Sequence, residues 1–364
     1  MRTGTTKLPL HGGKCPPWLF QKMQNLAGLI VEAVLLEFSS AEMLKRLSDP
    51  YWFQGLGCVL GFDWHSSGLT TTTCAALKEG IKGKEKELGF FIAGGKGKTA
   101  LQTPHEIEIL GTECALDNNL KKLQYTSRLV AKVDNAAMQD GFDLYQHCLF
   151  FNSKGDWAVV QQGMDGDNSW ARRYHWLREE VEDFVSRPHS AICSDYQQRN
   201  ILNLVSPESK DNRENSLELS RETPEKVLKE WASIKKNETT LNLPRSHPLP
   251  QGKKIFNAFK KAYEEQSQSY QQLLGIKGIG PQSLRALSLI AELSFGSIPD
   301  RRDPARYSFA HGGKDGHPYP VNKETFEHSI HVLQEAVNKS KIGENEKMHS
   351  LKRLGQFAQQ RSSD

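Results

Sequence analysis

The chain has 364 residues, about a quarter of them charged, and a formal net charge of +4. This length allows two or three domains, and the charge is too small for a histone-like binder of polyanions. The charge is also uneven. Residues 251–364 contain 17 Lys and Arg against 12 Asp and Glu, which gives +5, whereas the first 250 residues give −1. We therefore expect the C-terminal part to be the polyanion contact.

Six cysteines are scattered along the chain without a CxxC pair. This spacing argues against a zinc knuckle or a disulfide framework and is typical of reduced thiols. The longest apolar run, Leu26 to Phe38, contains Glu32 and Glu37 and is too short to span a bilayer. Because nothing resembles a signal peptide either, we expect a cytoplasmic protein with no membrane contact.

Helical and strand patterns alternate over the first 205 residues. The patterns predict helices over residues 17–38, from about 73, from 103, over 116–139 and over 169–185, and strands over 57–64 and 87–95. Residues 143–152 and 157–164, joined by the turn SKGD, predict a β-hairpin. The alternation favours an α/β (or α+β) domain over residues 1–205.

The composition then changes. Residues 206–222 are polar and lack aromatics, which predicts a linker. Residues 223–345 have helical patterns, interrupted by a Pro-rich stretch, and residues 346–364 form a polar tail. We therefore expect the N-terminal domain to be followed by an all-helical module.

A lysine follows two glycines three times in the sequence. His11 to Lys14 and His311 to Lys314 both read HGGK, and Gly94 to Gly97 read GGKG. Glycines let another molecule approach the backbone closely, and a lysine adds a positive charge, so Lys14, Lys96 and Lys314 are candidate phosphate contacts. Ordinary turns with solvated lysines are the alternative. A nucleotide-binding P-loop is not expected, because Ile92 stands where that motif needs a glycine.

The most specific motif is LLGIKGIGPQSLRALSLIAEL, residues 273–293. It predicts a helix, a tight turn at Gly278-Ile279-Gly280, and a second helix from Pro281, and it resembles the helix-hairpin-helix element of DNA-binding proteins. The resemblance implies that backbone N–H groups at the start of the second helix, near Gln282 and Ser283, hold a DNA phosphate without reading sequence. The alternative is a helical hairpin that only packs on a neighbour.

The resemblance extends to the helix-hairpin-helix DNA glycosylases. In those enzymes a catalytic aspartate follows the hairpin by some twenty residues, and LSFGSIPDRRDPARYSF places Asp300 and Asp303 there. Bifunctional members carry a Schiff-base lysine where this chain has Gln282. The resemblance therefore does not imply lyase chemistry by that route, and it covers only residues 270–310.

Over nearly its whole length the chain resembles an uncharacterised bacterial and archaeal family known as domain of unknown function seven-six-three. The blocks that carry the resemblance are LPLHGGKCPPWL, WHSSGLTT, AGGKGKTALQTPHEI, WAVVQQGM, ARRYHWL, RPHSAI and DPARYSFAHGGKDGHPYPV. It implies no activity, so the chemistry has to come from the residues themselves.

Polar residues gather where the predicted strands of the first domain end. Asp63 and His65 follow one strand, Lys96 ends the next, and His147 lies on the hairpin. We take these four with Lys14 as candidate catalytic residues, because Asp and His supply acid–base groups or metal ligands. Arg172 and Arg173, on a predicted helix, are candidate phosphate contacts. For each of these side chains, a structural histidine, a salt-bridged arginine or a turn aspartate is the alternative.

These features favour a DNA-processing enzyme, most simply a nuclease of DNA repair or turnover. We expect Mg²⁺ or Mn²⁺ to assist, through ligands that the sequence does not identify, and no nucleotide cofactor. A base-excision glycosylase using Asp300 or Asp303 and a non-catalytic DNA-binding adaptor are the alternatives. The sequence leaves the oligomeric state open.

Overall fold

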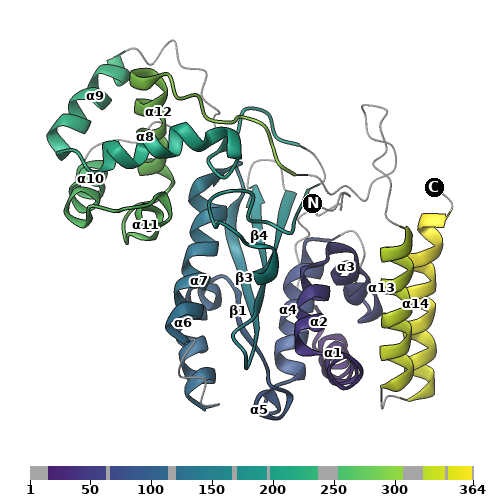
Figure 1. Ribbon diagram of the computed structural model, residues 1–364. Coiled ribbons are helices and arrows are strands. Elements are labelled where there is room, and N and C mark those ends of the chain that lie inside the picture. The colour runs from purple at the N-terminus through teal and green to yellow at the C-terminus, as the bar shows by residue number, and fades with distance from the viewer. Residues whose placement is uncertain are drawn as a thin grey trace.

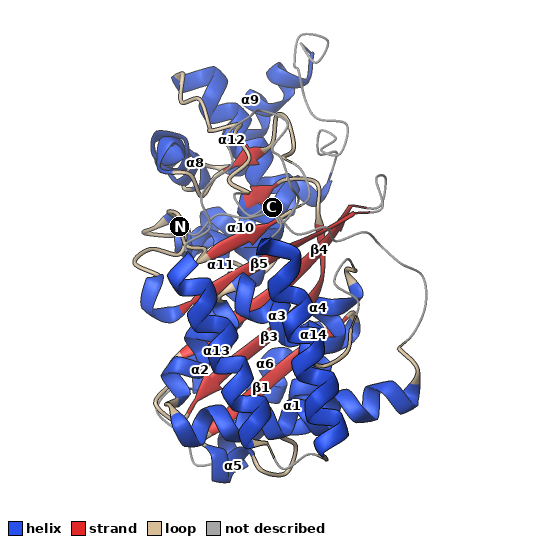
Figure 2. Cartoon of the chain, turned by 90° about the vertical axis from the view of Figure 1, so that its right-hand side faces the viewer, coloured by secondary structure: helices blue, strands red, loops and turns tan. Residues whose placement is uncertain are grey.

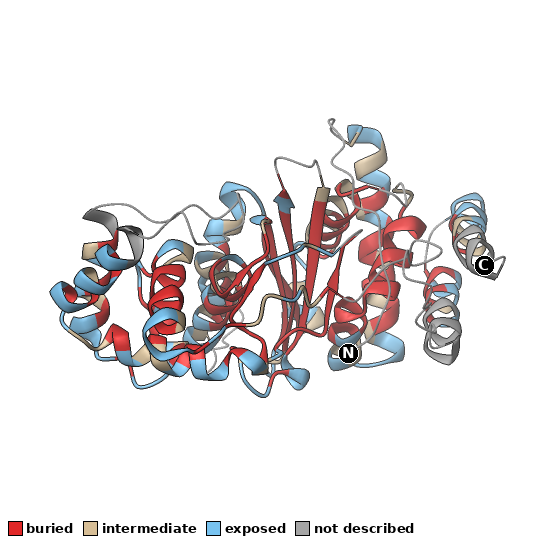
Figure 3. Cartoon of the chain, turned by 90° about the horizontal axis from the view of Figure 1, so that it is seen from above, coloured by how far each residue is buried: buried red, intermediate tan, exposed pale blue. Residues whose placement is uncertain are grey.

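The computed structural model describes residues 15–62, 66–113, 120–165, 170–194, 197–236, 253–305, 323–340 and 343–362. A sheet forms the middle layer, and helices cover both of its faces (Figure 3). The fold is therefore a mixed α/β sandwich of three layers.

Five antiparallel strands form the central sheet, in the order β1-β3-β4-β5-β6. These strands are β1 Phe90–Lys96, β3 Asp143–Asn152, β4 Trp157–Asp165, β5 Trp170–Leu177 and β6 Ala191–Cys193. A second, two-stranded sheet pairs β2 Met138–Gln139 with β7 Leu202–Asn203. Helices on both faces bury the central sheet on both sides, which explains why residues 148–151 of β3, CLFF, are apolar without alternation.

Each face of the central sheet carries its own hydrophobic core. We call one the α7 face; its strand residues include Phe91, Leu149, Val159 and Trp176. The other is the α4 face, with Ile92, Phe150, Val160 and Leu177. Because successive side chains of a strand point to opposite faces, neighbouring residues of β5 serve different cores.

The helices divide between these faces as Figures 1 and 2 show. The core of the α4 face includes residues of α1 Pro17–Glu37, α2 Ser40–Ser48, α3 Pro50–Val59, α4 Gly68–Gly80, α13 Lys323–Lys339 and α14 Glu344–Ser362. Of these, α13 and α14 lie outermost, against α1 and α3. The core of the α7 face includes residues of α6 Lys98–Glu113, α7 Leu120–Lys132, α8 Lys210–Ser220, α9 Pro224–Lys236, α10 Lys253–Glu265, α11 Tyr270–Gly275 and α12 Pro281–Phe295. The shorter elements are α5 Glu85–Leu88, a π-helix η1 Val133–Ala137, and 3-10 turns η2 Arg178–Glu180 and η3 Pro207–Ser209.

The first helix, the strand before the GGKG turn and the β-hairpin are confirmed. They correspond to α1, β1 and the β3–β4 pair, with register partners such as Phe151 and Trp157 beside the turn. Helix α1 is the one described helix whose length and apolar composition would suffice to cross a membrane, and Met23, Ile30 and Val31 on it are buried in the core.

Two elements differ in kind from the prediction. The strand expected at residues 57–64 is instead the end of helix α3, where Gly57 lies against Leu69 of α4. The helix expected over residues 169–185 begins as strand β5. The sequence placed Arg172 and Arg173 on that helix as candidate phosphate contacts, but both faces of β5 are buried and each arginine finds polar partners inside the protein.

Helix α6 begins earlier than expected, with Pro104 inside it rather than at its start. A proline has no N–H for the carbonyl four residues back. Here the Thr103 hydroxyl donates to that carbonyl, Ala100 O, over 2.7 Å. The side chain therefore replaces the hydrogen bond that the proline cannot make.

The predicted linker at 206–222 is wrong, because most of it forms η3 and α8. The polar side chains of α8 hold backbone carbonyls: Asn212 Nδ2 donates to Ser288 O (3.0 Å) and Ser297 O (2.6 Å), and Arg213 donates to Leu204 O over 2.9 Å. The expected polar tail contains α14 up to Ser362. Because α13 and α14 pack on the α4 face while α8 to α12 pack on the α7 face, the C-terminal helices do not gather in one separate module.

Candidate functional site

The turn between α11 and α12 is open to solvent around its two glycines. Gly278 has φ +104°, a conformation that favours glycine. A Cβ built on Gly278 or Gly280 would meet no protein atom within 4 Å. Gly280 is the N-cap of α12 and Ile279 between the glycines is buried, which anchors the turn. The fold therefore needs a glycine at 278 because of its positive φ. At 280 the backbone angle does not require glycine, and a side chain there would meet no protein atom.

Lys132, the last residue of α7, attaches this turn to the rest of the protein. Its ammonium donates to Leu274 O over 2.7 Å, to Ile279 O over 3.2 Å, and to Ile276 O. Burial, with a smaller contribution from Lys261, lowers the pKa of Lys132 to about 8, while the three carbonyls favour its charged form. The carbonyls of the turn thus point into the protein, and Lys277 and Gly278 remain exposed.

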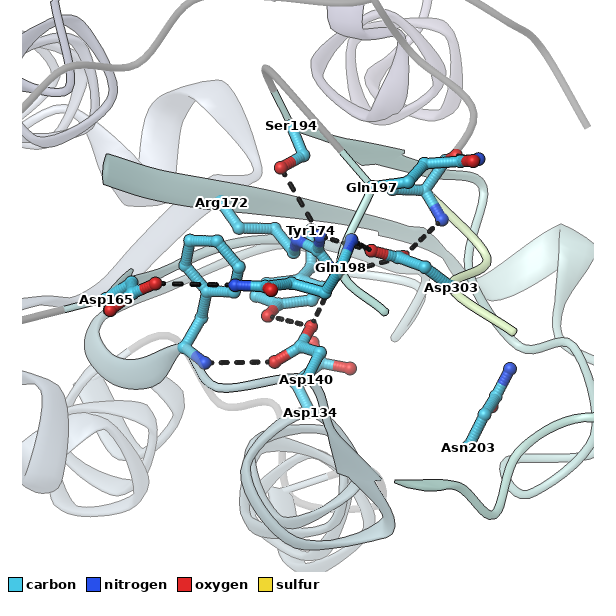
Figure 4. A network of polar contacts seen from close by, with 12 residues as sticks. Asp134, Asp140, Asp165, Arg172, Tyr174, Ser194, Gln197, Gln198, Asn203 and Asp303 are labelled. Carbon is cyan, nitrogen blue, oxygen red and sulfur yellow. Dashed lines mark hydrogen bonds and ion pairs between the residues drawn. The ribbon is translucent and has the colours of Figure 1, made fainter. Parts of the chain in front are cut away.

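A buried ion network surrounds Arg172 on the α7 face (Figure 4). Arg172 Nη1 lies 2.9 Å from Asp140 Oδ2, and its two terminal nitrogens bond both oxygens of Asp303, at 3.0 and 2.6 Å. The Tyr174 hydroxyl donates to Asp140 over 2.8 Å, and the guanidinium stacks over the Phe142 ring at 4.5 Å. The network joins β5 to the segment after α12, which brings Asp303 onto the central sheet.

The charges in this network are unequal, because two carboxylates share one guanidinium. Burial alone would lower the pKa of Arg172, but Asp303 and Asp140 raise it above its ordinary value. Burial raises the pKa of Asp140 to about 6, with Asp303 adding to the shift and Arg172 opposing it. Asp140 is therefore the carboxyl group of this network that takes up a proton when the pH falls.

The two aspartates proposed for glycosylase chemistry lie in structural roles. Both oxygens of Asp303 are engaged, since Gln198 N and Ala305 N donate to them in addition to Arg172. Asp300 accepts from Ser206 Oγ (2.7 Å) and from Arg302 Nε (2.9 Å). Burial would raise the pKa of Asp300, but the hydrogen bonds from Arg302 and Ser206 lower it below its ordinary value.

His147 belongs to a buried hydrogen-bonded chain on the α7 face. Its Nδ1 is 2.7 Å from Gln161 Oε1, so Nδ1 carries the proton, and the Ser127 hydroxyl donates to Nε2 over 2.9 Å. Gln161 donates in turn to Asp134 of the π-helix η1, which also binds Trp176 Nε1 (2.9 Å). Asp134 also pairs with His189 Nε2 over 2.5 Å. Burial lowers the pKa of His147, so this chain holds a neutral imidazole in one tautomer.

A second polar row crosses the sheet on the opposite, α4 face. Register partners place five side chains in line, one from each strand: Lys96, Gln146, Gln162, Arg173 and Cys193. Lys96 is exposed, whereas Gln146, Gln162 and Arg173 are at most 1% exposed. The row therefore runs from solvent into the interior of the protein.

This row meets the first turn of α4. Gln162 Nε2 donates to Ser67 O over 2.9 Å and also contacts the Tyr145 hydroxyl. Arg173 donates to Gln54 Oε1 over 3.0 Å and to Thr70 Oγ1 over 3.4 Å, and it lies over the Phe53 ring. These partners are all neutral, and no carboxylate in the described part of the chain forms an ion pair with Arg173. Burial lowers the pKa of Arg173 below its ordinary value.

The structure thus separates the residues that the sequence grouped. Lys96 and His147 lie on neighbouring strands, but their side chains belong to opposite faces. Arg172 and Arg173 are fully buried and leave no surface for DNA from solvent. Asp63, His65, Lys14 and Lys314 lie outside the described residues. Gln282 is exposed at the start of α12 and Ser283 is buried.

The sequence patterns did not single out several residues of these networks, among them Lys132, Asp134, Asp140 and Gln146. Lys132, Asp134 and Gln146 lie within apolar helical or strand patterns, and only that unexpected polarity could have marked them; Asp140 follows the predicted helix, where an aspartate resembles an ordinary turn residue. Within the described ranges no group of three His, Cys, Asp or Glu gathers that could hold a metal ion. The GGKG turn has a structural cause as well, because a Cβ on Gly94 would lie 2.2 Å from His147 O.

Comparison with known proteins gives a family and no further relative. No curated protein and no solved structure matches the chain. One family model matches residues 4–321, nearly the whole length, and it is described as "Protein of unknown function (DUF763)". The match includes the central sheet, both polar networks and the α11–α12 turn, and the chain therefore belongs to the DUF763 family.

Proposed function

We propose that this protein is a DNA-binding enzyme of DNA repair or turnover, a nuclease that holds the DNA backbone with the α11–α12 turn. The observation that supports this is the open space around Gly278 and Gly280 at the start of a 15-residue helix. The N-terminus of a helix carries a partial positive charge and free N–H groups, which favour phosphate. Contacts of this kind do not read bases, so we expect little sequence preference and a marked salt dependence.

Chemistry would take place at the open end of the α4-face row, where Lys96 is exposed. Lys96→Ala should lower turnover by roughly tenfold or more, the lower end of what a positioned acid–base group contributes, while the fold remains intact. Mg²⁺ or Mn²⁺ would act as Lewis acid on the phosphodiester, and such ions often use only one or two carboxylates together with substrate phosphates.

Incubation of the purified full-length protein with labelled duplex DNA, with and without Mg²⁺ or Mn²⁺, tests the reaction class. Strand breaks without alkali support the nuclease. Breaks that appear only after alkali would identify a glycosylase, and binding without any product would identify an adaptor. Either of the last two outcomes would overturn the proposed nuclease.

A matched pair of variants at Gly280 tests the DNA contact. Both Asp and Asn are good N-cap residues, so Gly280→Asp and Gly280→Asn should fold as well as the wild type. The aspartate adds a negative charge where we place the phosphate. A charge-assisted contact is worth roughly 1.5–3 kcal/mol, so Gly280→Asp should bind DNA about tenfold to a hundredfold more weakly than Gly280→Asn. Equal affinities of the two variants would exclude this turn as the DNA contact.

A further inference from the structure

The α4-face row has polar atoms that the described protein leaves without hydrogen-bond partners. Neither amide atom of Gln146 has one, although the residue is 1% exposed. Gln162 Oε1, Thr73 Oγ1 and Arg173 Nε lack partners as well. Buried polar atoms are rarely left unpaired, and each such atom needs an explanation.

These atoms face one region. Cys148 lies two residues from Gln146 on the same face of β3, and it contacts Cys74 of α4. Gln162 reaches Ser67, the N-cap of the same helix, whose own side chain makes no capping hydrogen bond, although Ser66 Oγ accepts from Gly68 N over 3.1 Å. Gln146, the register partner of Gln162, therefore points at the N-terminal turn of α4.

The charge of this region indicates what would fill it. Arg173 is buried with neutral partners only, and Lys96 stands at the solvent end of the same row. A buried water can satisfy an amide, but it cannot neutralise a buried guanidinium, and unpaired buried charges are costly. An anion would meet both needs.

The unpartnered atoms include acceptors as well as donors, namely the carbonyl oxygens of Gln146 and Gln162. Sulfate and an internal phosphodiester offer only acceptor oxygens at neutral pH. Inorganic phosphate carries a P–OH group in both its monoanionic and its dianionic form. A terminal phosphate monoester carries one as the monoanion, below its second pKa of about 6, so a site that accepts its hydrogen bond favours that form. A phosphate with such a group matches the mixture of donors and acceptors.

We infer that the first turn of α4, with Gln146, Gln162, Lys96 and the nearby charge of Arg173, forms a binding site for a phosphate monoester group. The group enters from the Lys96 end of the row. This site does not depend on the α11–α12 turn or on nuclease activity. Its ligand is either free phosphate or the phosphate end of a nucleic acid, such as the 5′-phosphate that strand cleavage can leave.

Thermal unfolding of the full-length protein tests the site. At a phosphate concentration about 100-fold above Kd, the unfolding midpoint should rise by roughly 3–5 °C. Chloride at the same ionic strength should give no rise, and sulfate a smaller one. If added phosphate leaves the unfolding midpoint of the wild type unchanged, the proposal is wrong.

Two variants of Gln146 locate the effect. Gln146→Leu should abolish the response to phosphate. Should it fail to fold, Gln146→Glu keeps the shape of the side chain and adds a negative charge to the row, with Gln162 between it and Arg173. That variant should not respond to phosphate, because its carboxylate repels the anion. Arg213→Met is the control, because Arg213 is a buried arginine held by the carbonyls of Leu204 and Ser206; it should keep the full response. A response retained in the Gln146 variants would mean that the amide holds only a buried water.

The source of the phosphate follows from one further comparison. A short oligonucleotide is titrated with and without a 5′-phosphate. If only the phosphorylated form raises the midpoint of the wild type, and Gln146→Glu removes that rise, the ligand is a nucleic-acid end. If inorganic phosphate alone acts, the ligand is the free anion. A rise with both oligonucleotides that persists in Gln146→Glu would contradict the site.

Discussion

Arg172 and Arg173 are neighbours in the sequence and equally buried, yet they stand in opposite electrostatic environments. On the α7 face Arg172 is held by two carboxylates, one of which also accepts from the Tyr174 hydroxyl, and its pKa is raised. On the α4 face Arg173 has an amide, a hydroxyl and a ring as partners, and its pKa is lowered. A buried charge whose ion pairs are complete serves the fold. Within the described residues Arg173 has no such carboxylate partner, and the proposed phosphate site rests on this together with the unpartnered amide of Gln146.

The hydrogen bonds of the two polar networks differ as well. In the network of Asp134, His147 and Gln161 the side-chain atoms have partners, whereas Gln146 and Gln162 of the α4-face row have unpartnered atoms. Unpartnered atoms also occur among the helices of the α7 face, at Tyr270 and Ser288, so the contrast holds for the two networks and not for the two faces. Polar residues that are fully bonded rigidify a core. The two networks are equally buried, so burial alone does not distinguish them; they differ in whether their polar atoms have partners.

The largest expected effect comes from Arg172→Met. The substitution leaves Asp140 and Asp303 buried without a cation, and removing one partner of a buried ion pair costs about 3–5 kcal/mol. We expect a corresponding loss in the free energy of unfolding, measured by urea denaturation at neutral pH. Arg172→Lys keeps the charge but not the two-pronged geometry, so it should fall between Arg172→Met and the wild type. If Arg172→Met were as stable as the wild type, the ion pairs of Arg172 would not stabilise the fold, and the contrast with Arg173 would be wrong.

The second prediction uses the pH dependence of the same network. The pKa of Asp140 rises from 3.8 to about 6 on folding, so between these values the folded state binds more protons than the unfolded state. Stability from this group is therefore complete below pH 4 and is lost as the pH rises through 6. The loss amounts to roughly 2–3 kcal/mol, since one pKa unit corresponds to about 1.4 kcal/mol.

Asp140→Asn removes the titrating group and keeps the shape. As the pH is raised from 4 to 7 in a series of urea titrations, the free energy of unfolding of Asp140→Asn should increase relative to that of the wild type. Parallel pH profiles of the two proteins would show that Asp140 stays ionised throughout, and the network would then hold two full negative charges.

The smallest effect is expected for Arg173→Met. Removing a cation that has no carboxylate partner also removes the cost of burying it, so the change should lie within about 1 kcal/mol of the wild type, in either direction. Urea denaturation without phosphate measures it beside Arg172→Met. A loss as large as that of Arg172→Met would indicate that Arg173 has a compensating anion within the fold, and the contrast between the two faces would disappear.

Local pattern was sufficient for the elements whose apolar residues repeat without interruption. The strand at β1, the β3–β4 hairpin and the two helices around Gly278-Ile279-Gly280 all agree with the sequence reading. Pattern was insufficient for β5, which was predicted as a helix although its arginines and histidine are buried in a strand, and for α8, whose polar residues such as Asn212 and Arg213 predicted a linker. In both elements the polar groups are satisfied by parts of the chain far away in sequence.

The sequence by itself determined the family, the mixed α/β class and the glycine turn before α12, because these depend on local residue types. Only the tertiary structure decided which polar residues share a face. His147 and Lys96 seemed to belong to one site, but the two-residue period of a strand and the register of β1 with β3 send them to opposite cores. Asp303 meets Arg172 across 131 positions of sequence, a distance over which no local pattern carries information. The same pairing across the sheet brings Gln146, Gln162 and Arg173 into one row, since register, and not spacing along the chain, fixes which charges and amides lie together.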